Sequence, residues 1–556
     1  MDSELKILIQ MNTSLGAATI IGVCGIFFLL CSGQSHSVIK PTTYYVLGGG
    51  AGSCSGAGWG NAAGKIPSTL NPGDVVYIGN SGVNLADPTT TPCAGEANHI
   101  FATSGTSGSH ITIKAAIGAD HGTSTGWRSS YGVDADPKIM WANSYTAADG
   151  LKSGFWSFCP GSYYDINGEV GTADQTGTYG FYFKSAGVIF GFIKADSNDC
   201  SQTSITTLNF KNFEIDGVEA NTIASDGSNA SGIYMGSPVS TGATVTSVSF
   251  SHYYVHDILA PWNFINMTGV SLDHGYTDTN FSDSKEHSQG LFGYSAGGID
   301  TNLALNNLTV DDTVWKNIQG TAVIICLTGT CDGWKIYNNI IYYSSDWDSV
   351  CNHGGDGSYI VTCGISKTFG DNSAATALTN SVFYGNTMAG LHTDHTVDPS
   401  GSDESGVTIN GNSSTGNVVE NNIWYNCTLA DIFYDGSNSH PTLLTHDYNT
   451  WLNAGYASFA MELASHELQI GASGQTITRT AADPFVNDAG FDFHLLADMK
   501  SAAKSRKATA QGKPLPSPYN IDFDGKTRGA DGTWERGAHE FNKAGSGQKS
   551  KISHES

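Results

Sequence analysis

The chain has 556 residues, of which 26 are Lys or Arg and 51 are Asp or Glu, so its formal net charge is −25. A field of this sign repels phosphate backbones and excludes nucleic acid as the expected partner. Only 14% of residues are charged, 68 residues are Gly, and aromatic residues make up 11%. The aromatic content excludes a disordered chain, and the composition favours short strands joined by tight turns.

The amino-terminal run LGAATIIGVCGIFFLLC (residues 15–31) is apolar and carries no charge. Its length suits the core of a signal peptide or a short membrane anchor. We therefore expect residues 1–40 to be a signal peptide or anchor with its linker, and the protein to be secreted or attached to the cell surface. Lipid attachment at Cys31 is an open alternative. Any membrane contact is expected only through this segment.

Export permits disulfide bonds, which makes the cysteine spacing informative. Spacing does not determine connectivity, and a metal–thiolate site is the rival interpretation, although no CxxC pair occurs. We expect Cys427 to have no partner. The expected pairs are Cys54 with Cys93, Cys159 with Cys200, Cys326 with Cys331, and Cys351 with Cys363.

Similar short segments recur in the middle of the chain, each with a small polar residue, most often Asn, before an apolar or aromatic strand. They are KNFEID (211–216), SHYYVHD (251–257), NNLTVDD (306–312), NNIIYYS (338–344), NSVFYGN (380–386) and NNIWYN (421–426). Such recurrence is typical of a solenoid, in which successive coils share one core. Asn at a fixed place in successive coils predicts an amide ladder, and Asn also tolerates the left-handed backbone of a sharp corner.

At this point the chain resembles the right-handed parallel β-helix, or pectin-lyase-like, superfamily. The segment 44–82, with PGDVVYI at 72–78, is similar to the first coil of that family, and HITIKAA (110–116) to the next rung. The segments 492–505 and 520–541 resemble its closing region. The resemblance implies an all-β fold: a single right-handed parallel β-helix with long loop insertions over residues 41–541, followed by a disordered polar tail at 542–556. The catalytic motifs of polygalacturonases and pectate lyases do not occur, so no catalytic subfamily is matched.

Long polar insertions interrupt the strands at 143–180, 219–246, 273–304 and 345–378. Insertions of a solenoid emerge as loops, often on one face, and that face commonly binds ligand. The insertion around 273–304 contains SDSKEHSQGLFGY (282–294), and the segments before and after it add further carboxylates, histidines and tryptophans. If the coils stack, these residues gather as acids, bases and sugar-stacking rings.

We therefore assign candidate roles within these segments. The candidate catalytic residues are Glu286, His287, Asp311, Asp312 and Lys316, and the candidate substrate-binding residues are His256, Asp257, Trp262, Asp273, His274 and Trp315. A loop whose polar side chains only meet water is the alternative interpretation. Near the carboxyl end, Asp522, Asp524 and Asp531 loosely resemble a calcium loop, and we expect them to close the last coil instead.

Two reactions would use such a site. Glycoside hydrolysis needs two carboxylates, and their separation sets the stereochemical outcome. β-Elimination from a uronate needs a base, for which Lys316, Lys285 and His287 are the candidates, and usually a cation. Ca²⁺ is the possible cofactor, bound at Asp311 and Asp312 or at Asp346 and Asp348, because it favours clustered carboxylate oxygens.

The sequence thus predicts a secreted or surface β-helix protein that binds a polysaccharide or cell-surface glycan and, if it is an enzyme, cleaves it as a polysaccharide lyase or glycoside hydrolase. The alternative is a non-catalytic extracellular adhesin or structural β-helix protein.

Overall fold

The computed structural model describes most of the chain from Lys40 to Phe541. The described residues are 40–143, 155–171, 179–185, 191–196, 200, 203–217, 231–236, 243–258, 260–278, 289–295, 304–318, 320–344, 365–373, 375–391, 406–409, 411–427, 432–434, 444–454, 463–473, 476–477, 483–496, 512–530 and 532–541. Contacts divide the chain into Met1–Pro41 and Thr42–Ser556, and every described strand belongs to the second unit. Within the described part, no helix has both the length and the apolar character needed to cross a membrane. The predicted export segment at 15–31 and the tail at 542–556 lie outside the described residues.

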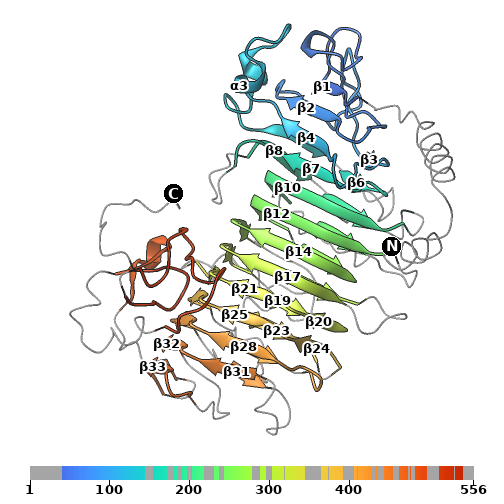
Figure 1. The fold of residues 1–556 in the computed structure, drawn as a ribbon. Coiled ribbons are helices and arrows are strands. Elements are labelled where there is room, and N and C mark those ends of the chain that lie inside the picture. Colours follow the sequence, from blue (N-terminus) through green and yellow to red (C-terminus); the bar gives the residue numbers. More distant parts are fainter. Residues whose placement is uncertain are drawn as a thin grey trace, which may run out of the picture. The chain divides into compact units, whose positions relative to one another are not determined.

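Parallel strands dominate the second unit (Figure 1). The first sheet has 23 strands: β1 (Thr43–Leu47), β2 (Val75–Gly79), β4 (Ile111–Ala115), β5 (Ile139–Asn143), β7 (Tyr164–Asn167), β8 (Phe181–Ser185), β10 (Ile205–Asp216), β12 (Val245–His256), β14 (Met267–Asp273), β15 (Tyr276–Asp278), β17 (Leu305–Asp311), β18 (Val314–Lys316), β20 (Thr330–Asp332), β21 (Lys335–Tyr337), β22 (Ile340–Tyr342), β24 (Ala377–Thr379), β25 (Val382–Tyr384), β26 (Thr387–Ala389), β28 (Asn417–Glu420), β29 (Ile423–Tyr425), β31 (Leu444–Asp447), β32 (Thr450–Leu452) and β33 (Leu468–Ile470).

The second sheet has ten strands: β3 (His99–Phe101), β6 (Trp156–Phe158), β9 (Ile193–Asp196), β11 (Ser231–Gly236), β13 (Ala260–Ile265), β16 (Leu291–Tyr294), β19 (Gly320–Cys326), β23 (Ile365–Asp371), β27 (Val407–Ile409) and β30 (Ile432–Tyr434). Two antiparallel pairs follow, β34 (Ala472–Ser473) with β35 (Thr476–Ile477) and β36 (Phe485–Asn487) with β37 (Asp492–Leu495). The helices are short: α3 (Gly118–His121) and the 3₁₀ turns η1 (Trp59–Asn61), η2 (Ser129–Tyr131) and η4 (Asp488–Gly490).

Each middle coil repeats the same course. In one coil the chain runs through β14, bends at His274, continues as β15 and returns through β16 in the second sheet; the next coil does the same through β17, Asp312, β18 and β19. Strands of successive coils pair in parallel, for example β14 with β17, β15 with β18 and β16 with β19. The predicted parallel β-helix is therefore confirmed.

The amino-terminal coils also follow the prediction. β1 pairs in parallel with β2, and β2 with β4, which places PGDVVYI and HITIKAA on successive rungs. One 3₁₀ turn, η1, lies between β1 and β2.

The bend inside the first sheet uses left-handed backbone at one position of successive coils. Asn212, His252, His274, Asp312 and Asn338 all have φ between 47° and 61°. Asn and Asp tolerate this region because their short polar side chains bond locally. The prediction of left-handed corners is confirmed, and the corner places a polar residue at the same position of these successive coils.

An amide ladder runs just inside that bend. The side-chain amide of Asn339 donates to Asn386, Asn386 to Asn422, and Asn422 to Asn449, each at 3.0 Å. All four side chains are buried. The predicted ladder is confirmed, but the six Asn-led segments do not share one place in the coil: Asn307 and Asn380 bend the chain at a different corner from Asn338 and Asn421.

The inside of the coils is filled by stacked aromatic and aliphatic side chains. Phe210 stacks on Phe250 in the next coil at 5.1 Å between ring centroids, and Trp424 stacks on Trp451 at 5.1 Å. A ring in one coil cannot bury both of its faces alone, so the ring at the same position of the neighbouring coil covers one of them.

Three of the four predicted disulfides are formed, Cys54–Cys93, Cys159–Cys200 and Cys326–Cys331. Cys427 is a free, buried cysteine, as predicted. Cys351 and Cys363 lie outside the described residues.

The chain after β37 forms a closing segment, residues 512–530 and 532–541, that packs on the outer surface of the later coils. Arg528 donates to Asn338 at 2.8 Å, and Arg536 donates to the backbone carbonyl of Asn449 at 2.9 Å. Asp522 accepts from the backbone N–H groups of Lys526 and Glu540. The structural role predicted for Asp522 is therefore confirmed, while Asp531 lies outside the described residues.

Candidate functional site

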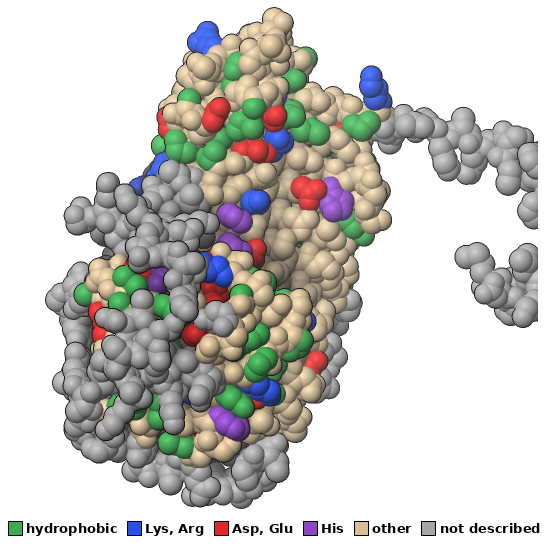
Figure 2. All heavy atoms as spheres, turned by 60° about the vertical axis from the view of Figure 1, so that its left-hand side comes forward, with side chains coloured by type: hydrophobic (Ala, Val, Ile, Leu, Met, Phe, Trp, Pro, Cys, Tyr) green, Lys and Arg blue, Asp and Glu red, His purple; other side chains and the backbone are tan. Residues whose placement is uncertain are grey.

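Charged side chains gather on the outer face of the first sheet where the strands end. Strands β8, β10, β12, β15 and β18 finish at or next to this place; the polar insertion 219–246 follows β10, and the remainder of the insertion 273–304 follows β15. Figure 2 shows a hollow on this side of the unit in which histidine, Lys or Arg, and Asp or Glu side chains lie together. Two groups of residues make up the candidate site, and we name them the charged row and the acid corner.

The charged row has one member on each of five successive strands. Register pairs Lys184 with Asp216, Asp216 with His256, His256 with Asp278, and Asp278 with Lys316. Neighbouring strands lie about 4.8 Å apart, so cation and anion alternate at that spacing. Side chains alternate in direction along a strand, and neighbours of the row such as Ile215, Val255 and Trp315 lie in the core, so the five side chains of the row face away from it.

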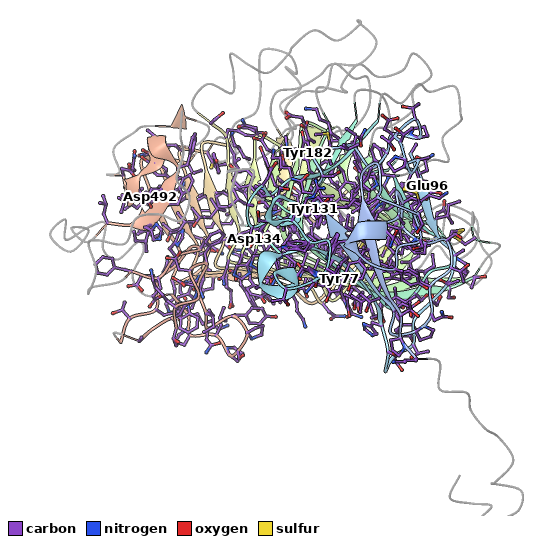
Figure 3. The ribbon with its side chains drawn as sticks, turned by 90° about the horizontal axis from the view of Figure 1, so that it is seen from above. Tyr77, Glu96, Tyr131, Asp134, Tyr182 and Asp492 are labelled. Carbon is purple, nitrogen blue, oxygen red and sulfur yellow. A yellow bond between two sulfur atoms is a disulfide. The ribbon has the colours of Figure 1, made fainter. Side chains whose placement is uncertain are left out.

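Short contacts tie the row together. Lys184 Nζ lies 3.1 Å from Asp216 Oδ2, and Lys316 Nζ lies 3.1 Å from Asp278 Oδ2. Tyr182, labelled in Figure 3, donates its hydroxyl to the same Asp216 oxygen at 2.5 Å. Asp278 is 2% exposed, whereas the Lys184 side chain is 39% exposed. The aspartates of the row are therefore buried, whereas Lys184 is partly exposed to solvent.

His256 is held between two carboxylates. Its Nδ1 lies 2.7 Å from Asp257 Oδ2 and its Nε2 lies 3.3 Å from Glu214 Oε1, and the ring of Tyr254 stacks on it at 3.9 Å. Burial alone would lower the pKa of His256, but the hydrogen bonds to Asp257 and Glu214 outweigh it and raise the pKa to about 9. His256 is therefore an imidazolium at neutral pH, suited to donating a proton or a hydrogen bond and unsuited to acting as a base.

The acid corner lies at the bends of the two coils that also carry Asp278 and Lys316. Asp273 and Asp311 are register partners at the ends of β14 and β17, and His274 and Asp312 follow them at the left-handed positions. His274 Nδ1 bonds to Asp273 Oδ1, and its Nε2 lies 3.8 Å from Asp312 Oδ2. The side chains of His274 and Asp273 are 44% and 36% exposed, whereas that of Asp312 is 10% exposed.

The corner holds its carboxyl groups in different protonation states. Burial and the neighbouring charge of Asp311 raise the pKa of Asp312 to about 8. Burial and the charge of Asp273 raise the pKa of Asp311 to about 6, although the hydroxyl of Tyr337 donates to it at 2.7 Å. The hydrogen bond to Asp273 raises the pKa of His274. At neutral pH, Asp312 therefore carries a proton and Asp311 is mostly ionised, the separation that acid–base catalysis uses.

Two groups near the site have the geometry of metal ligands. One oxygen or nitrogen from each of Asp273, His274 and Asp312 lies within 4.8 Å of the others, and the same holds for Asp216, His256 and Asp257. Asp312 Oδ1 is buried and has no hydrogen-bond partner among the described residues. The three carboxylates of the acid corner are the kind of oxygen ligand that Ca²⁺ prefers, so this corner, more than the charged row, fits a hard cation.

Most predicted site residues that the structure describes are brought together. Asp273, His274, Asp311 and Asp312 form the acid corner, His256 and Lys316 belong to the charged row, and Asp257 bonds to His256. Glu286, His287, Asp346 and Asp348 lie outside the described residues.

The prediction for the two tryptophans is wrong. Trp262 and Trp315 are 0% exposed, and Trp262 Nε1 donates to the buried hydroxyl of Thr277. Both rings lie in the core of the coil, because they occupy the inward positions of β13 and β18. A ring whose faces are both covered cannot stack on a sugar.

Several site residues were missed from the sequence, namely Tyr182, Lys184, Glu214 and Asp216. The signal was present in FYFKS and KNFEID, where polar residues alternate with apolar ones. Alternation at period two puts Glu214 and Asp216 on one face of a strand, opposite the core-facing Phe213 and Ile215.

Comparison with known proteins gives no assignment. No family model matches the chain, and no curated protein matches it. Among solved structures, the chain is similar to the pectate lyase Pel9A, with 14% identity, a TM-score of 0.30, and coverage of 92% of this chain and 100% of that one. It is also similar to the A-module of the mannuronan C-5 epimerase AlgE6 of Azotobacter vinelandii, with 12% identity, a TM-score of 0.28, and coverage of 66% and 91%.

A third similar structure is a mannuronic acid specific polysaccharide family 6 lyase from human gut microbiota, with 11% identity, a TM-score of 0.27, and coverage of 78% and 80%. At such low identities and TM-scores the likenesses assign no activity. The fold assignment stands on the strand register of the chain itself.

Proposed function

We propose that the protein binds a polysaccharide along the outer face of β8–β18 and hydrolyses its glycosidic bonds at the acid corner. One observation carries the proposal: Asp273, His274, Asp311 and Asp312, from two successive coils, converge at one bend with part of the group open to solvent. Buried carboxyl groups cost free energy, so their grouping at a partly exposed corner favours a role in acid–base chemistry.

The roles follow from protonation and exposure. Asp312, with a pKa of about 8, is the general acid that donates its proton to the leaving oxygen. The half-exposed Asp273 is the carboxylate that attacks the anomeric carbon. Water then displaces Asp273 from the sugar, after giving its proton to the Asp312 carboxylate. Asp311 keeps the pKa of Asp312 high by its charge.

The spacing favours retention of configuration. Oxygens of Asp273 and Asp312 lie within 4.8 Å of one another. Retaining enzymes place their carboxyl groups about 5–5.5 Å apart, while inverting enzymes need about 6.5–9.5 Å to admit a water molecule. The approach of the two oxygens is therefore nearer to the first arrangement than to the second.

The charged row is the proposed binding surface. Lys184 and Lys316 of the row have side chains that are 39% and 17% exposed, and Asp257, which bonds to His256, is 26% exposed; they offer donors and acceptors to sugar hydroxyls. The net charge of −25 disfavours a polyanionic chain, so we propose a neutral polysaccharide as the substrate.

Elimination is less well supported by this geometry. His256 is an imidazolium with both ring nitrogens bound to carboxylates, and Lys184 and Lys316 each contact a buried carboxylate. Ca²⁺ at the acid corner would be held by Asp273, Asp311 and Asp312, and its charge would stabilise the ionised form of Asp312. A cation there therefore opposes the general-acid role.

A panel of neutral and acidic polysaccharides, with and without Ca²⁺, tests the proposal. Release of reducing ends from a neutral polysaccharide without ultraviolet-absorbing products supports it. Ultraviolet-absorbing products that require Ca²⁺ would replace hydrolysis by elimination. Binding without any new reducing end would favour the non-catalytic adhesin or structural protein.

A further inference from the structure

A third group of imidazole and carboxylate side chains lies away from the acid corner. His494 belongs to β37, whereas Asp524 and His539 belong to the closing segment. His494 Nε2 lies 2.8 Å from Asp524 Oδ2, His539 Nδ1 lies 3.6 Å from the same oxygen, and the two imidazole rings stack at 4.1 Å. One ligand atom from each residue lies within 4.8 Å of the others.

His539 points its Nδ1 at Asp524 from 3.6 Å, which is longer than a hydrogen bond. It is 3% exposed, and its Nδ1 is buried with no hydrogen bond among the described residues. A buried polar atom that makes no hydrogen bond costs about 1–3 kcal/mol. The 3.6 Å contact with Asp524 therefore leaves Nδ1 without a hydrogen bond in a buried position.

The group also has the outer support that metal-binding histidines use. Asp492, labelled in Figure 3, lies on β37 with Oδ1 2.5 Å from His494 Nδ1. A metal-ligating histidine usually bonds to a carboxylate through its other nitrogen, which fixes the ring and raises its basicity. This contact leaves Nε2 of His494 pointed at Asp524 and His539.

We propose that His494 Nε2, His539 Nδ1 and one oxygen of Asp524 bind a divalent transition metal ion of the Zn²⁺ class. Two imidazoles and one carboxylate suit Zn²⁺ better than Ca²⁺, which prefers oxygen ligands alone. The fourth position is left to water. The ion would join β37 to the closing segment, two parts of the chain that are separated by the undescribed residues 497–511.

Replacing Lys526 distinguishes a metal site from an ion-pair network. Its Nζ lies 2.8 Å from Asp524 Oδ2, the oxygen that both imidazoles face, so the ammonium competes with a metal ion for that atom. Lys526→Gln should therefore tighten metal binding. If the group were only an ion-pair network, the same change would remove the ion pair between Lys526 and Asp524 and would not tighten metal binding.

The experiment uses the full chain freed of metal by chelator, titrated with Co²⁺ and followed by the visible absorption of the bound ion. We expect one Co²⁺ per chain, displaced by Zn²⁺ and accompanied by a rise in Tm. Asp492→Asn keeps all three ligands and should weaken binding about 10–100-fold. The matched control is His466→Gln, which removes an exposed imidazole bonded to Asp447 and should leave binding unchanged.

His494→Gln should abolish the Co²⁺ absorption. His539→Gln changes a buried residue, so its folding is checked first by circular dichroism, and the Asp492 and Lys526 variants decide between a metal site and an ion-pair network. The proposal is overturned if the wild-type chain shows no Co²⁺ absorption, or if Asp492→Asn and Lys526→Gln bind Co²⁺ as the wild type does.

Discussion

Asp273 and Asp311 are register partners on the adjacent strands β14 and β17, and each is followed by a residue in left-handed conformation, His274 and Asp312. The bend turns four ionisable side chains outward within two coils. A straight strand would have sent every second one into the core. The shape of the coil therefore creates the acid corner, and the corner sets the protonation of Asp312.

The pH dependence of hydrolysis should report Asp312. Because its pKa is raised to about 8, kcat/KM should fall as pH rises through 8, where the acid loses its proton. Asp311→Asn removes the negative charge that raises this pKa, so the basic limb should move to lower pH. Profiles of kcat/KM against pH for the two proteins check this, and coincident basic limbs would contradict the assignment.

His256 should make stability depend on pH. Its folded pKa of about 9 exceeds the ordinary value of 6.5, so its contribution is full below pH 6.5 and is lost as pH rises through 9. The loss is at most about 3 kcal/mol. His256→Gln should reduce the fall in Tm over this range. If the Tm of His256→Gln fell with pH as that of the wild type does, the hydrogen bonds of His256 to Glu214 and Asp257 would not raise its pKa.

The amide ladder should be a large local contributor to stability. Asn386→Leu removes a side chain that bonds to both Asn339 and Asn422 and leaves buried polar groups without partners. Each such group costs about 1–3 kcal/mol. Denaturant unfolding should show a loss of at least that size, with a smaller loss for the exposed Asn61→Ala. If both variants lost the same free energy of unfolding, the ladder would contribute no more to stability than an exposed Asn does.

Cys427 should be unreactive in the folded protein. Burial raises the pKa of its thiol to about 12, so the reactive thiolate is scarce and reagents cannot reach it. Peptide mapping after treatment with iodoacetamide should find Cys427 unmodified in the native protein and modified after unfolding. Rapid labelling of this cysteine under native conditions would show that the coils open there.

The fold could be predicted because its signals are local and repeated. Asn at the corners, apolar strands between them and paired cysteine spacings each reflect a constraint that acts within one or two coils. The same signals did not separate the corner of Asn307 and Asn380 from that of Asn338 and Asn421, because both need the same left-handed residue.

The candidate site was predicted only in part, for a geometric reason. Asp311 and Asp312 are visible as an acidic pair, but the partnership of Asp216 with His256 depends on the register of strands forty residues apart. Whether Trp262 and Trp315 point inward depends on strand phase, and both are core residues. Their aromatic character alone could not separate sugar stacking from packing.

The central claim is tested most directly by reducing-end release from the best neutral polysaccharide by Asp273→Asn and Asp312→Asn. Asp136→Asn, which changes an exposed carboxylate outside the site, is the matched control. We predict that the first two variants lose at least about 100-fold in rate while remaining folded, and that the control retains the wild-type rate. Wild-type rates in both Asp273→Asn and Asp312→Asn would contradict catalysis at the acid corner.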